Sequence, residues 1–331
     1  MYKKNHLLYL AAVATMVSCT AAGSVDSGKD AESLVPARLT VRINGLETKV
    51  NGDMGDSNVE SASVYVFSSD GTLDGTATSA GNTVTVNCSQ GVGKKVYVVV
   101  NKPLSSISSI SSLQAATTSL SDNGQNQFVM TGSAENVEVL AKDNPTVNVD
   151  VTRFASKVSI GTITNSLKET GWKDKTFTVK GIYLINVPAG NYPLFADSYT
   201  PSLWQNKMAW ESGCHEFTAD KAINQNIALN AQGTFNRTYY CYPNPTGTDV
   251  NGGTFSPRKT RLVIEVQIDT RTFYYPITLA SVERNTHYSI TNLTITRLGS
   301  SDPDYPVNSG QITFDLTVKP WVPSNMNSIT I

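Results

Sequence analysis

Charged residues, histidines and cysteines are scarce in this chain, and each scarcity narrows its function. Asp, Glu, Lys and Arg make up 16% of the 331 residues, and the 26 basic side chains nearly balance the 27 acidic ones. Binding to nucleic acid requires a basic face that neutralises phosphates, so we expect no nucleic-acid partner. The frequent Ser, Thr, Asn and Val residues are instead typical of an extracellular all-β protein.

Motifs of the common catalytic classes are missing as well. The sequence contains no Gly-x-Ser-x-Gly motif, no phosphate-binding glycine loop and no Cys-x-x-Cys pair. His215 lies beside Cys214 and Glu216, but a metal site usually needs further ligands, which do not cluster here. Segments 51–58 and 122–126 contain oxygen ligands without the spacing of a calcium loop. We therefore expect no catalytic residue, no cofactor and no metal.

The chain begins with the pattern of an export signal. Lys3 and Lys4 precede an apolar run that is too short to span a bilayer as a mature helix. The run ends in Ser18 and Cys19, and a cysteine behind a small residue at this point resembles a bacterial lipobox. From this pattern we predict a signal peptide over residues 1–18 and acylation of Cys19. Two or more acyl chains on this cysteine would give stable anchoring in a membrane. An ordinary signal peptide with an incidental cysteine is the alternative.

Three thiols remain if Cys19 is acylated. In an oxidising compartment Cys214 and Cys241 could form a disulfide, which would leave Cys88 as a small buried hydrophobic residue. The sequence does not show the distance between the two sulfur atoms, so the bridge and the free thiols both stay open.

A half-buried strand is predicted behind a flexible leader of residues 19–37. Leu39, Val41 and Ile43 alternate with polar residues, which is the period of a strand with one face in a core. Sites for a trypsin-like protease lie before, within and behind this strand, at Arg38, Arg42 and Lys49.

Further strands and one helix are predicted up to residue 153. Segments 62–69 and 95–101 are continuously apolar, as strands covered on both faces are, and we expect 83–88 to pair with 95–101. Apolar residues at helical spacing make 104–120 the best helix candidate. Three more strands are predicted at 127–132, 135–141 and 145–153.

The second half of the chain continues the β pattern. In the strand predicted at 176–187, we expect Phe177, Val179, Tyr183 and Ile185 to share one face. Other strands are predicted at 153–165, 234–243, 260–268, 271–279, 286–296, 310–321 and 327–331. The apolar phase of 286–296 switches near Thr291 and Asn292, which predicts a bulge.

Aromatic residues of this half suggest an anchor and a possible binding face. Residues 188–234 are irregular, and we expect Trp204 and Trp210 to anchor this excursion. Five tyrosines could form a sugar-stacking face, but strand aromatics with one buried row explain them better: Tyr239, Tyr240, Tyr242, Tyr274 and Tyr275. His287, at a strand start, is expected to be structural.

Together these patterns predict an all-β fold. Roughly a dozen strands fall into two sets with little helix, which is typical of two tandem β-sandwich domains. We place an N-terminal domain at 38–152 and a C-terminal domain at 153–331, behind the signal peptide and the leader.

The order of several short motifs resembles a known family. After the lipobox follow "ARLTVRI", "KKVYVVVNKP", "FVMTGSAENVEV", "VTRFASKVSI", "ERNTHYSITNLTIT" and a closing "VKPWVPS". This arrangement is similar to the fimbrillins of Bacteroidales, the major subunits of type V pili, over essentially the whole chain.

The resemblance implies that both sandwich domains are transthyretin-like, and it implies a function in surface fimbriae, adhesion and biofilm formation. Such subunits reach the outer membrane as lipoproteins, and a trypsin-like or arginine-specific protease, gingipain in the best-known case, then cuts behind the first strand. The C-terminal strand of another copy fills the groove, so the partners are other pilins, the membrane lipid and the protease. Neither ATP nor a cofactor is needed.

Strand addition has a physical basis in this sequence. A lost strand leaves unpaired backbone groups and empty side-chain sites, and an alternating strand near a chain end repairs both. Segment 310–321 alternates without a fault and is followed by an apolar tail. The candidate donor residues are Ile312, Phe314, Leu316, Val318, Ile329 and Ile331. Whether one segment or both are donated stays open.

The cleavage bond and the role in the fimbria also stay open. Lys49 is the only basic residue in the loop behind the first strand, so we rank it before Arg42. A cut at Arg38 would leave most of the strand in place. The donor-like tail favours a stalk subunit, and a tip or anchor adhesin and a glycan-binding surface lipoprotein are the alternatives.

Overall fold

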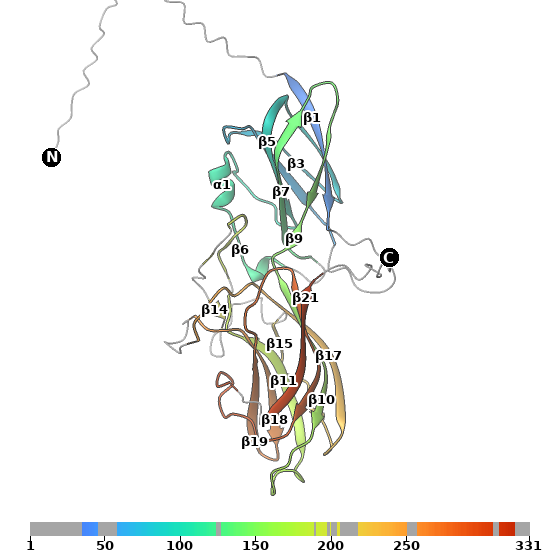
Figure 1. Cartoon of the computed structure of the whole chain (residues 1–331), viewed down its shortest axis with the longest axis vertical. Helices are drawn as coiled ribbons and strands as arrows, with labels where there is room; N and C mark the ends of the chain where they lie inside the picture. The colour runs from blue at the N-terminus through green and yellow to red at the C-terminus, as the bar shows by residue number, and fades with distance from the viewer. Residues whose placement is uncertain are drawn as a thin grey trace, which may run out of the picture. The chain divides into compact units, whose positions relative to one another are not determined.

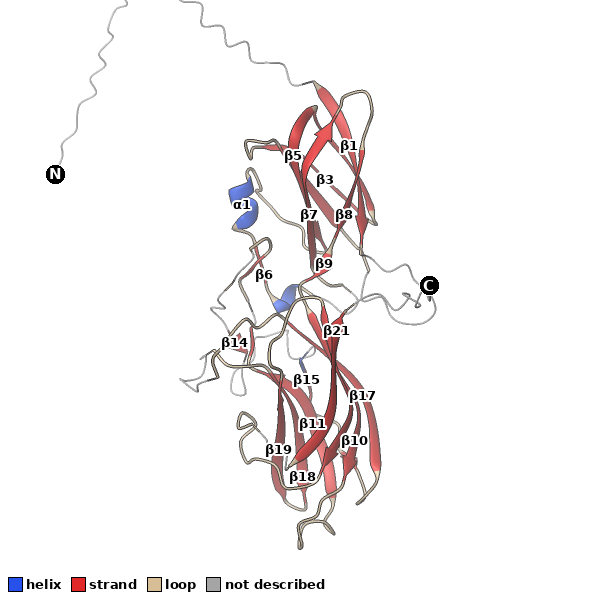
Figure 2. Ribbon diagram, in the orientation of Figure 1, coloured by secondary structure: helices blue, strands red, loops and turns tan. Residues whose placement is uncertain are grey.

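The computed structural model describes residues 35–45, 58–123, 127–188, 190–196, 199, 204–205, 218–249, 257–306 and 311–321. Strands dominate this part of the chain, and helical structure includes the short helix α1 (Ile110–Gln114) and a 3-10 turn (Leu120–Asp122), as Figures 1 and 2 show. Within these residues no helix is both long and apolar enough to cross a membrane. The prediction of an all-β fold with little helix is confirmed.

The strands of the first half form two sheets, which we call the N-terminal sandwich. One sheet has the order β4-β1-β8, and the other has the order β3-β2-β5-β7-β9. The bounds are β1 (Pro36–Asn44), β2 (Ala62–Phe67), β3 (Leu73–Ser79), β4 (Thr83–Ser89), β5 (Gly91–Val100), β7 (Met130–Val139), β8 (Thr146–Asp150) and β9 (Thr152–Arg153). Side chains from both sheets form one valine-rich core.

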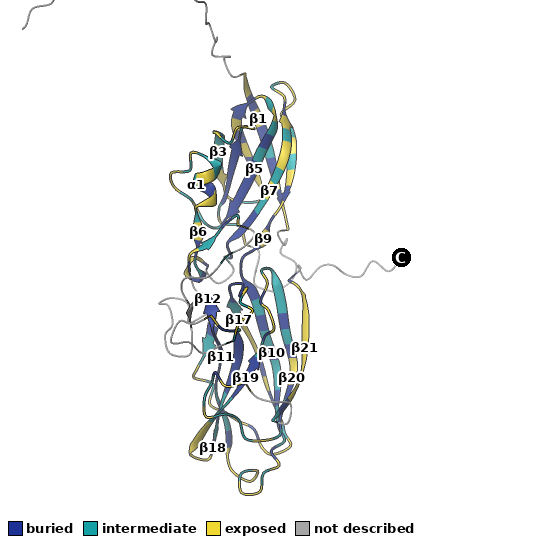
Figure 3. Ribbon diagram, turned by 60° about the vertical axis from the view of Figure 1, so that its left-hand side comes forward, coloured by how far each residue is buried: buried dark blue, intermediate teal, exposed yellow. Residues whose placement is uncertain are grey.

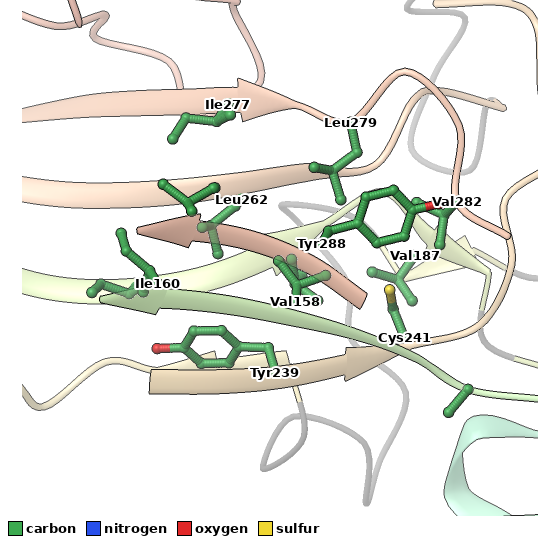
Figure 4. Packing of buried hydrophobic residues seen from close by; sticks show 14 of the residues in the cluster. Val158, Ile160, Val187, Tyr239, Cys241, Leu262, Ile277, Leu279, Val282 and Tyr288 are labelled. Carbon is green, nitrogen blue, oxygen red and sulfur yellow. The ribbon is translucent and has the colours of Figure 1, made fainter. Parts of the chain in front are cut away.

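The strands of the second half form the C-terminal sandwich. Its sheets have the orders β17-β10-β20-β21 and β15-β11-β18-β19, with β16 also paired to β11. The bounds are β10 (Ser156–Asn165), β11 (Phe177–Ile185), β15 (Ala219–Asp220), β16 (Gln225–Asn226), β17 (Gln232–Cys241), β18 (Arg261–Ile268), β19 (Arg271–Thr278), β20 (Thr286–Ile295) and β21 (Ile312–Pro320). Figure 4 shows part of its core, where Val158, Tyr288 and Leu262 pack between the sheets.

Short strands in the irregular excursion tie it to other parts of the chain. β12 (Val187–Pro188) pairs with β14 (Trp204–Gln205), and β13 (Tyr192–Pro193) pairs with β6 (Thr117–Thr118) of the first half. The side chain of Trp204 and all of Trp210 lie outside the described residues, so their predicted anchoring stays a prediction.

Both sandwiches connect their strands in the same way. In the N-terminal sandwich β1 pairs antiparallel with β4 and parallel with β8, and β2 pairs with β3 and β5. In the C-terminal sandwich β10 pairs antiparallel with β17 and parallel with β20, and β11 pairs with β15, β16 and β18. The middle strand β1 therefore corresponds to β10. Strand β21, beyond β20, has no counterpart among the described strands of the N-terminal sandwich.

The predicted pairing of 83–88 with 95–101 is wrong. These segments form β4 and β5, which lie in different sheets: β4 pairs with β1, whereas β5 pairs with β2 and β7. β5 begins at Gly91, directly after Gln90, so no residues remain for a hairpin loop. The chain instead crosses between the sheets at this point, where the amide of Ser89 donates to the carboxylate of Asp74.

The predicted helix at 104–120 is mostly absent, and two predicted strands are one. Only Ile110–Gln114 is α-helical, with a reciprocal capping box between Ser109 and Ser112. The serine-rich sequence has too low a helix propensity to extend the helix further. Segments 127–132 and 135–141 merge into the single strand β7.

Bulges decide which side chains of β11 and β20 face the core. In β11 the register shifts between Val179 and Gly181, so the predicted single face is wrong. Phe177 and Val179 belong to the main core, whereas Tyr183 and Ile185 join a separate cluster. In β20 the register shifts between residues 290 and 293, which confirms the predicted bulge.

Candidate functional site

Strand β1 is the central, buried strand of the smaller N-terminal sheet. Its inward residues Ala37, Leu39, Val41 and Ile43 are all buried, and Leu39 and Val41 are 0% exposed. The alternation predicted from the sequence is therefore confirmed. Figure 3 shows the buried and exposed residues along this strand.

Both edges of β1 are hydrogen-bonded to neighbours. Seven residue pairs join it to β4, from Pro36 opposite Ser89 to Arg42 opposite Thr83, and five join it to β8. Adjacent strands lie about 4.8 Å apart, so loss of β1 would leave a gap of about 9.6 Å between the open edges of β4 and β8. We call this space the β1 slot.

The walls of the β1 slot also lie close to the larger sheet of the sandwich. A Cβ atom on Gly75 of β3 would overlap the carbonyl oxygen of Asn87 in β4, and one on Gly132 of β7 would overlap that of Asp150 in β8. Glycine thus lets the larger sheet approach both outer strands of the smaller sheet closely. β4 and β8 therefore each contact the opposite sheet as well as β1.

Short β-branched side chains form the floor of the slot. Val64 and Val66 of β2 and Val96 and Val98 of β5 are 0% exposed and share a core with β1. This floor is apolar and can accept any strand with apolar residues at alternate positions.

The predicted protease sites differ in their surroundings. Arg38 and Arg42 point outward from β1 but lie within the ladder, opposite Asn87 and Thr83. Lys49 lies outside the described residues. Proteases prefer exposed, unpaired loops to paired strands, so the ladder disfavours cutting at either arginine.

Strand β21 contrasts with β1, because it lies at a sheet edge and is poorly covered. Among the described strands it pairs with β20 alone, and of its alternating apolar residues only Ile312 is buried. Phe314, Leu316 and Val318 are 38%, 37% and 54% exposed. Figure 3 shows this strand as an exposed edge. Ile329 and Ile331 lie outside the described residues, as does Cys19.

The structure does not contain the disulfide that the sequence allowed. Cys241 is a free, fully buried thiol, and Figure 4 shows it within the core close to Val158 and Tyr288. Burial raises the pKa of this thiol and makes it less reactive. Cys214, its predicted partner, lies outside the described residues. Cys88 is also free and buried, as expected for a small hydrophobic residue.

The strand tyrosines and His287 have structural contacts, whereas His215 lies outside the described residues. Tyr239, Tyr242 and Tyr275 are buried in the core, so the five strand tyrosines do not form one exposed stacking face. His287 forms a hydrogen bond with Ser159, with Oγ and Nε2 2.8 Å apart. Within the described residues no three His, Cys, Asp or Glu side chains are arranged to hold a metal ion.

Sequence reasoning missed the surroundings of Trp321, directly behind β21. Its side chain is 4% exposed and stacks on Tyr240 at 5.6 Å, with Phe128 at 5.3 Å edge-on. The guanidinium of Arg153 lies 4.6 Å from its ring centroid. The only sequence signal was the tryptophan that ends the alternating strand, and nothing near it in sequence indicated these partners.

Comparison with known proteins tests the resemblance seen in the sequence. Residues 37–177 match the sequence profile of the family described as major fimbrial subunit protein (FimA). The structural match with a fimbrilin from Porphyromonas gingivalis covers 86% of this chain and 98% of that one, at 18% identity and a TM-score of 0.61. The predicted relationship to the fimbrillins is confirmed.

Two further solved structures are similar in fold to this chain. A candidate cell adhesion protein from Bacteroides eggerthii is 19% identical, with 87% of this chain and 97% of that chain covered and a TM-score of 0.61. A tip fimbrial protein from Porphyromonas gingivalis is 14% identical, with 87% and 99% covered and a TM-score of 0.53. No functionally curated protein matches the sequence significantly.

These matches support a fimbrial, cell-adhesion protein. The family match implies assembly with other fimbrial subunits at the cell surface, and a structural rather than an enzymatic role. At these identities the solved structures establish the fold alone.

Proposed function

We propose that this chain is a stalk subunit of a type V fimbria. It is exported as a lipoprotein acylated on Cys19, is trimmed behind β1, and polymerises when a C-terminal strand of another copy enters the β1 slot. The observation that carries this proposal is the burial of β1 between β4 and β8, at the head of the chain and behind a segment predicted to be lost.

Loss of β1 would leave the N-terminal sandwich with an open core and unpaired strand edges, which favours binding of another strand. Each of its buried aliphatic side chains contributes about 1.5–3 kcal/mol, and the open edges of β4 and β8 would present unpaired backbone groups. An incoming alternating strand restores the burial and both ladders at once. The joint needs no cofactor, because refilling the core supplies the driving force.

Strand β21 fits the role of the donor because it loses little buried apolar surface and the backbone hydrogen bonds of one strand edge when it leaves its own subunit. Three of its four alternating apolar side chains are substantially exposed there, and within the described part of the chain only one edge is paired. In the β1 slot the same side chains would be buried, at about 25 cal/mol for each Å² of apolar surface removed from water. The apolar tail with Ile329 and Ile331 can extend this donor.

We propose cleavage after Lys49, in the segment between β1 and β2. Cutting there removes the whole of β1, whereas cutting after Arg42 leaves most of the strand attached and cutting after Arg38 nearly all of it. A trypsin-like protease accepts lysine, so the protease partner need not be specific for arginine.

A stalk role agrees better with β21 than a tip or anchor role does. A tip subunit has no need to donate a strand, yet β21 presents an alternating, exposed apolar row. The fold does not separate these roles, because a tip fimbrial protein shares it. Binding of glycans through the strand tyrosines is disfavoured, since three of the five are buried.

Trypsin treatment of the precursor without residues 1–18 tests the proposal. We expect a ladder of oligomers on gels of unboiled samples, filaments by electron microscopy, and loss of the ladder on boiling. Lys49→Gln should slow assembly, with Lys173→Gln, at an exposed lysine of the C-terminal sandwich, as the matched control. A trimmed protein that stays monomeric would contradict the proposal.

A further inference from the structure

The attachment of β21 to its own subunit is concentrated at the two ends of the strand. The middle of the strand contributes little burial, since every residue from Thr313 to Pro320 is exposed. Ile312 at its start and Trp321 directly behind its end are buried, at 3% and 4% exposure. The side-chain contacts that retain β21 are therefore those of its terminal residues.

Trp321 contacts both sandwiches. Tyr240 of β17 stacks on its ring at an interplanar angle of 24°, and Phe128, just before β7, meets it edge-on. Its backbone amide donates to the carbonyl of Asn285 at 2.7 Å. Stacked aromatic pairs and a desolvated cation over the ring each add to the burial of the indole.

Arg153 is the cation over this ring and also binds the backbone of Trp321. Its guanidinium donates to the Trp321 carbonyl oxygen at 3.3 Å and to Oδ1 of Asn285 at 3.3 Å. Arg153 is itself buried and belongs to β9, which pairs with β7 in the N-terminal sandwich. One side chain thus links the N-terminal sandwich to the base of the C-terminal strand.

The same segment also contacts the end of β1. The amide of Val151 donates to the carbonyl of Asn44, the last residue of β1, at 3.1 Å. Val151 is buried in the core that β1 completes, two residues before Arg153. Removal of β1 would deprive Val151 of a hydrogen bond and of packing, which frees the segment that positions Arg153.

We propose that Trp321 latches β21 to its own subunit and that loss of β1 weakens this latch through Val151 and Arg153. The inference rests on the proposed strand exchange and adds a mechanism that controls when the donor strand is released. The donor strand is retained while β1 is present and becomes available when the slot opens, so trimming creates the acceptor and releases the donor together.

Hydrogen exchange of residues 312–320, measured on the precursor without residues 1–18, tests the latch. Trp321→Ala should accelerate exchange there at least about tenfold, because each tenfold corresponds to about 1.4 kcal/mol of lost attachment and burial of a tryptophan exceeds that. Trp321→Phe, which keeps an aromatic ring, should restore much of the protection. Trp172→Ala is the matched control, because Trp172 packs against Phe273 elsewhere in the C-terminal sandwich.

Trimming tests the connection to β1. Pulse labelling directly after trypsin treatment, at low protein concentration so that second-order assembly lags, should show faster exchange at 312–320 in the wild type. Trimming should add little in Trp321→Ala, because the latch is already absent and effects on one shared contact are not additive.

The possible outcomes separate the latch from the proposed function. Unchanged exchange in Trp321→Ala overturns the latch, even if filaments form normally. Equal acceleration by trimming in the wild type and in Trp321→Ala overturns the connection through Trp321. A trimmed protein with a released β21 that never polymerises supports the latch and overturns the proposed function instead.

Discussion

The two sandwiches have the same strand pairing, yet we propose different fates for their middle strands. β1 and β10 each pair antiparallel with one neighbour and parallel with another, and each buries an alternating apolar face. β10 follows directly on the first sandwich, whereas β1 follows a leader and is proposed to be removed. If the proposal holds, one architecture serves both as a permanent domain and as an acceptor, and the difference lies in the covalent attachment of one strand.

The sandwiches also differ in their buried charges. In the N-terminal sandwich Lys94 and Asp74 form one buried ion pair, with Nζ and Oδ2 2.7 Å apart. In the C-terminal sandwich Asp304 binds two arginines, Arg258 at 2.7 Å and Arg261 at 3.0 Å. The larger network fixes the loop before β21 to the start of β18, so we expect the C-terminal sandwich to be the more rigid of the two.

The largest expected effect would come from breaking this network. Arg258 and Arg261 both pair with Asp304 and with the more exposed Asp249. Asp304→Asn removes the more deeply buried of these two carboxylates, and removing one partner of a buried ion pair costs about 3–5 kcal/mol. Lys94→Met, which leaves only Asp74 unpaired, should destabilise its sandwich less. Urea unfolding followed by hydrogen exchange locates each loss.

The control for this comparison is an exposed carboxylate of the same sandwich. Asp174→Asn, on an exposed turn, should change the free energy of unfolding by less than about 0.5 kcal/mol. If Asp304→Asn behaves like this control, the buried network does not make the C-terminal sandwich more rigid.

Truncation of core residues distinguishes the removable strand from the permanent one. Leu39→Ala in β1 should destabilise the precursor by about 2–5 kcal/mol, because Leu39 is fully buried. In trimmed, assembled fimbriae the same substitution should have no effect, since β1 is gone. Ile160→Ala in β10 should destabilise both forms, as measured by urea unfolding of precursor and polymer. A persistent effect of Leu39→Ala in the polymer would show that β1 is retained.

A smaller effect is expected in β21 of the precursor. Leu316→Ala should cost the monomer less than about 1 kcal/mol, because this side chain is 37% exposed on its own subunit. In the polymer the substitution should accelerate dissociation in denaturant, since the proposed slot buries the same side chain. Thr317→Ala, at an outward position of the same strand, serves as the control. Equal stability of both polymers would argue against β21 as the donor.

The smallest expected effect is on pH dependence. Burial of Asp74 works against ionisation, but hydrogen bonds from Lys94 and Ser89 outweigh it and lower the carboxyl pKa. A carboxyl with a lowered folded pKa contributes stability above its unfolded pKa of about 3.9, and this is lost as pH falls through the folded value. Asp74→Asn should therefore flatten the loss of stability between about pH 5 and pH 2.

The C-terminal sandwich provides the parallel measurement. Burial of Asp249 likewise opposes ionisation, and hydrogen bonds from Arg261 and the Lys259 amide outweigh it, so its pKa is also lowered. Asp249→Asn should flatten the same acidic limb in urea titrations. A slope that neither substitution changes would assign acid sensitivity to other carboxyl groups.

The positions of most strands were predictable from the sequence, whereas their pairing partners were not. Alternation identified β1, β10 and β21, and the phase switch identified the bulge in β20. The same reasoning paired β4 with β5, because neighbours in sequence are the usual partners, and the chain crosses to the other sheet instead. One inserted residue in β11 reversed the faces of Tyr183 and Ile185, which a regular period of two does not anticipate.

The sequence alone determined the class of this protein: its β period, its predicted export signal, the alternating strand β21 and the motif order that resembles the fimbrillins. The tertiary structure decided that β1 lies between two partners, that β21 lies at an exposed edge, and that Trp321 contacts Arg153. The physical reason is the separation along the chain of the residues that interact. Periodicity is local and is written in neighbouring residues, whereas β-sheet edges and burial arise from contacts between segments far apart in the chain.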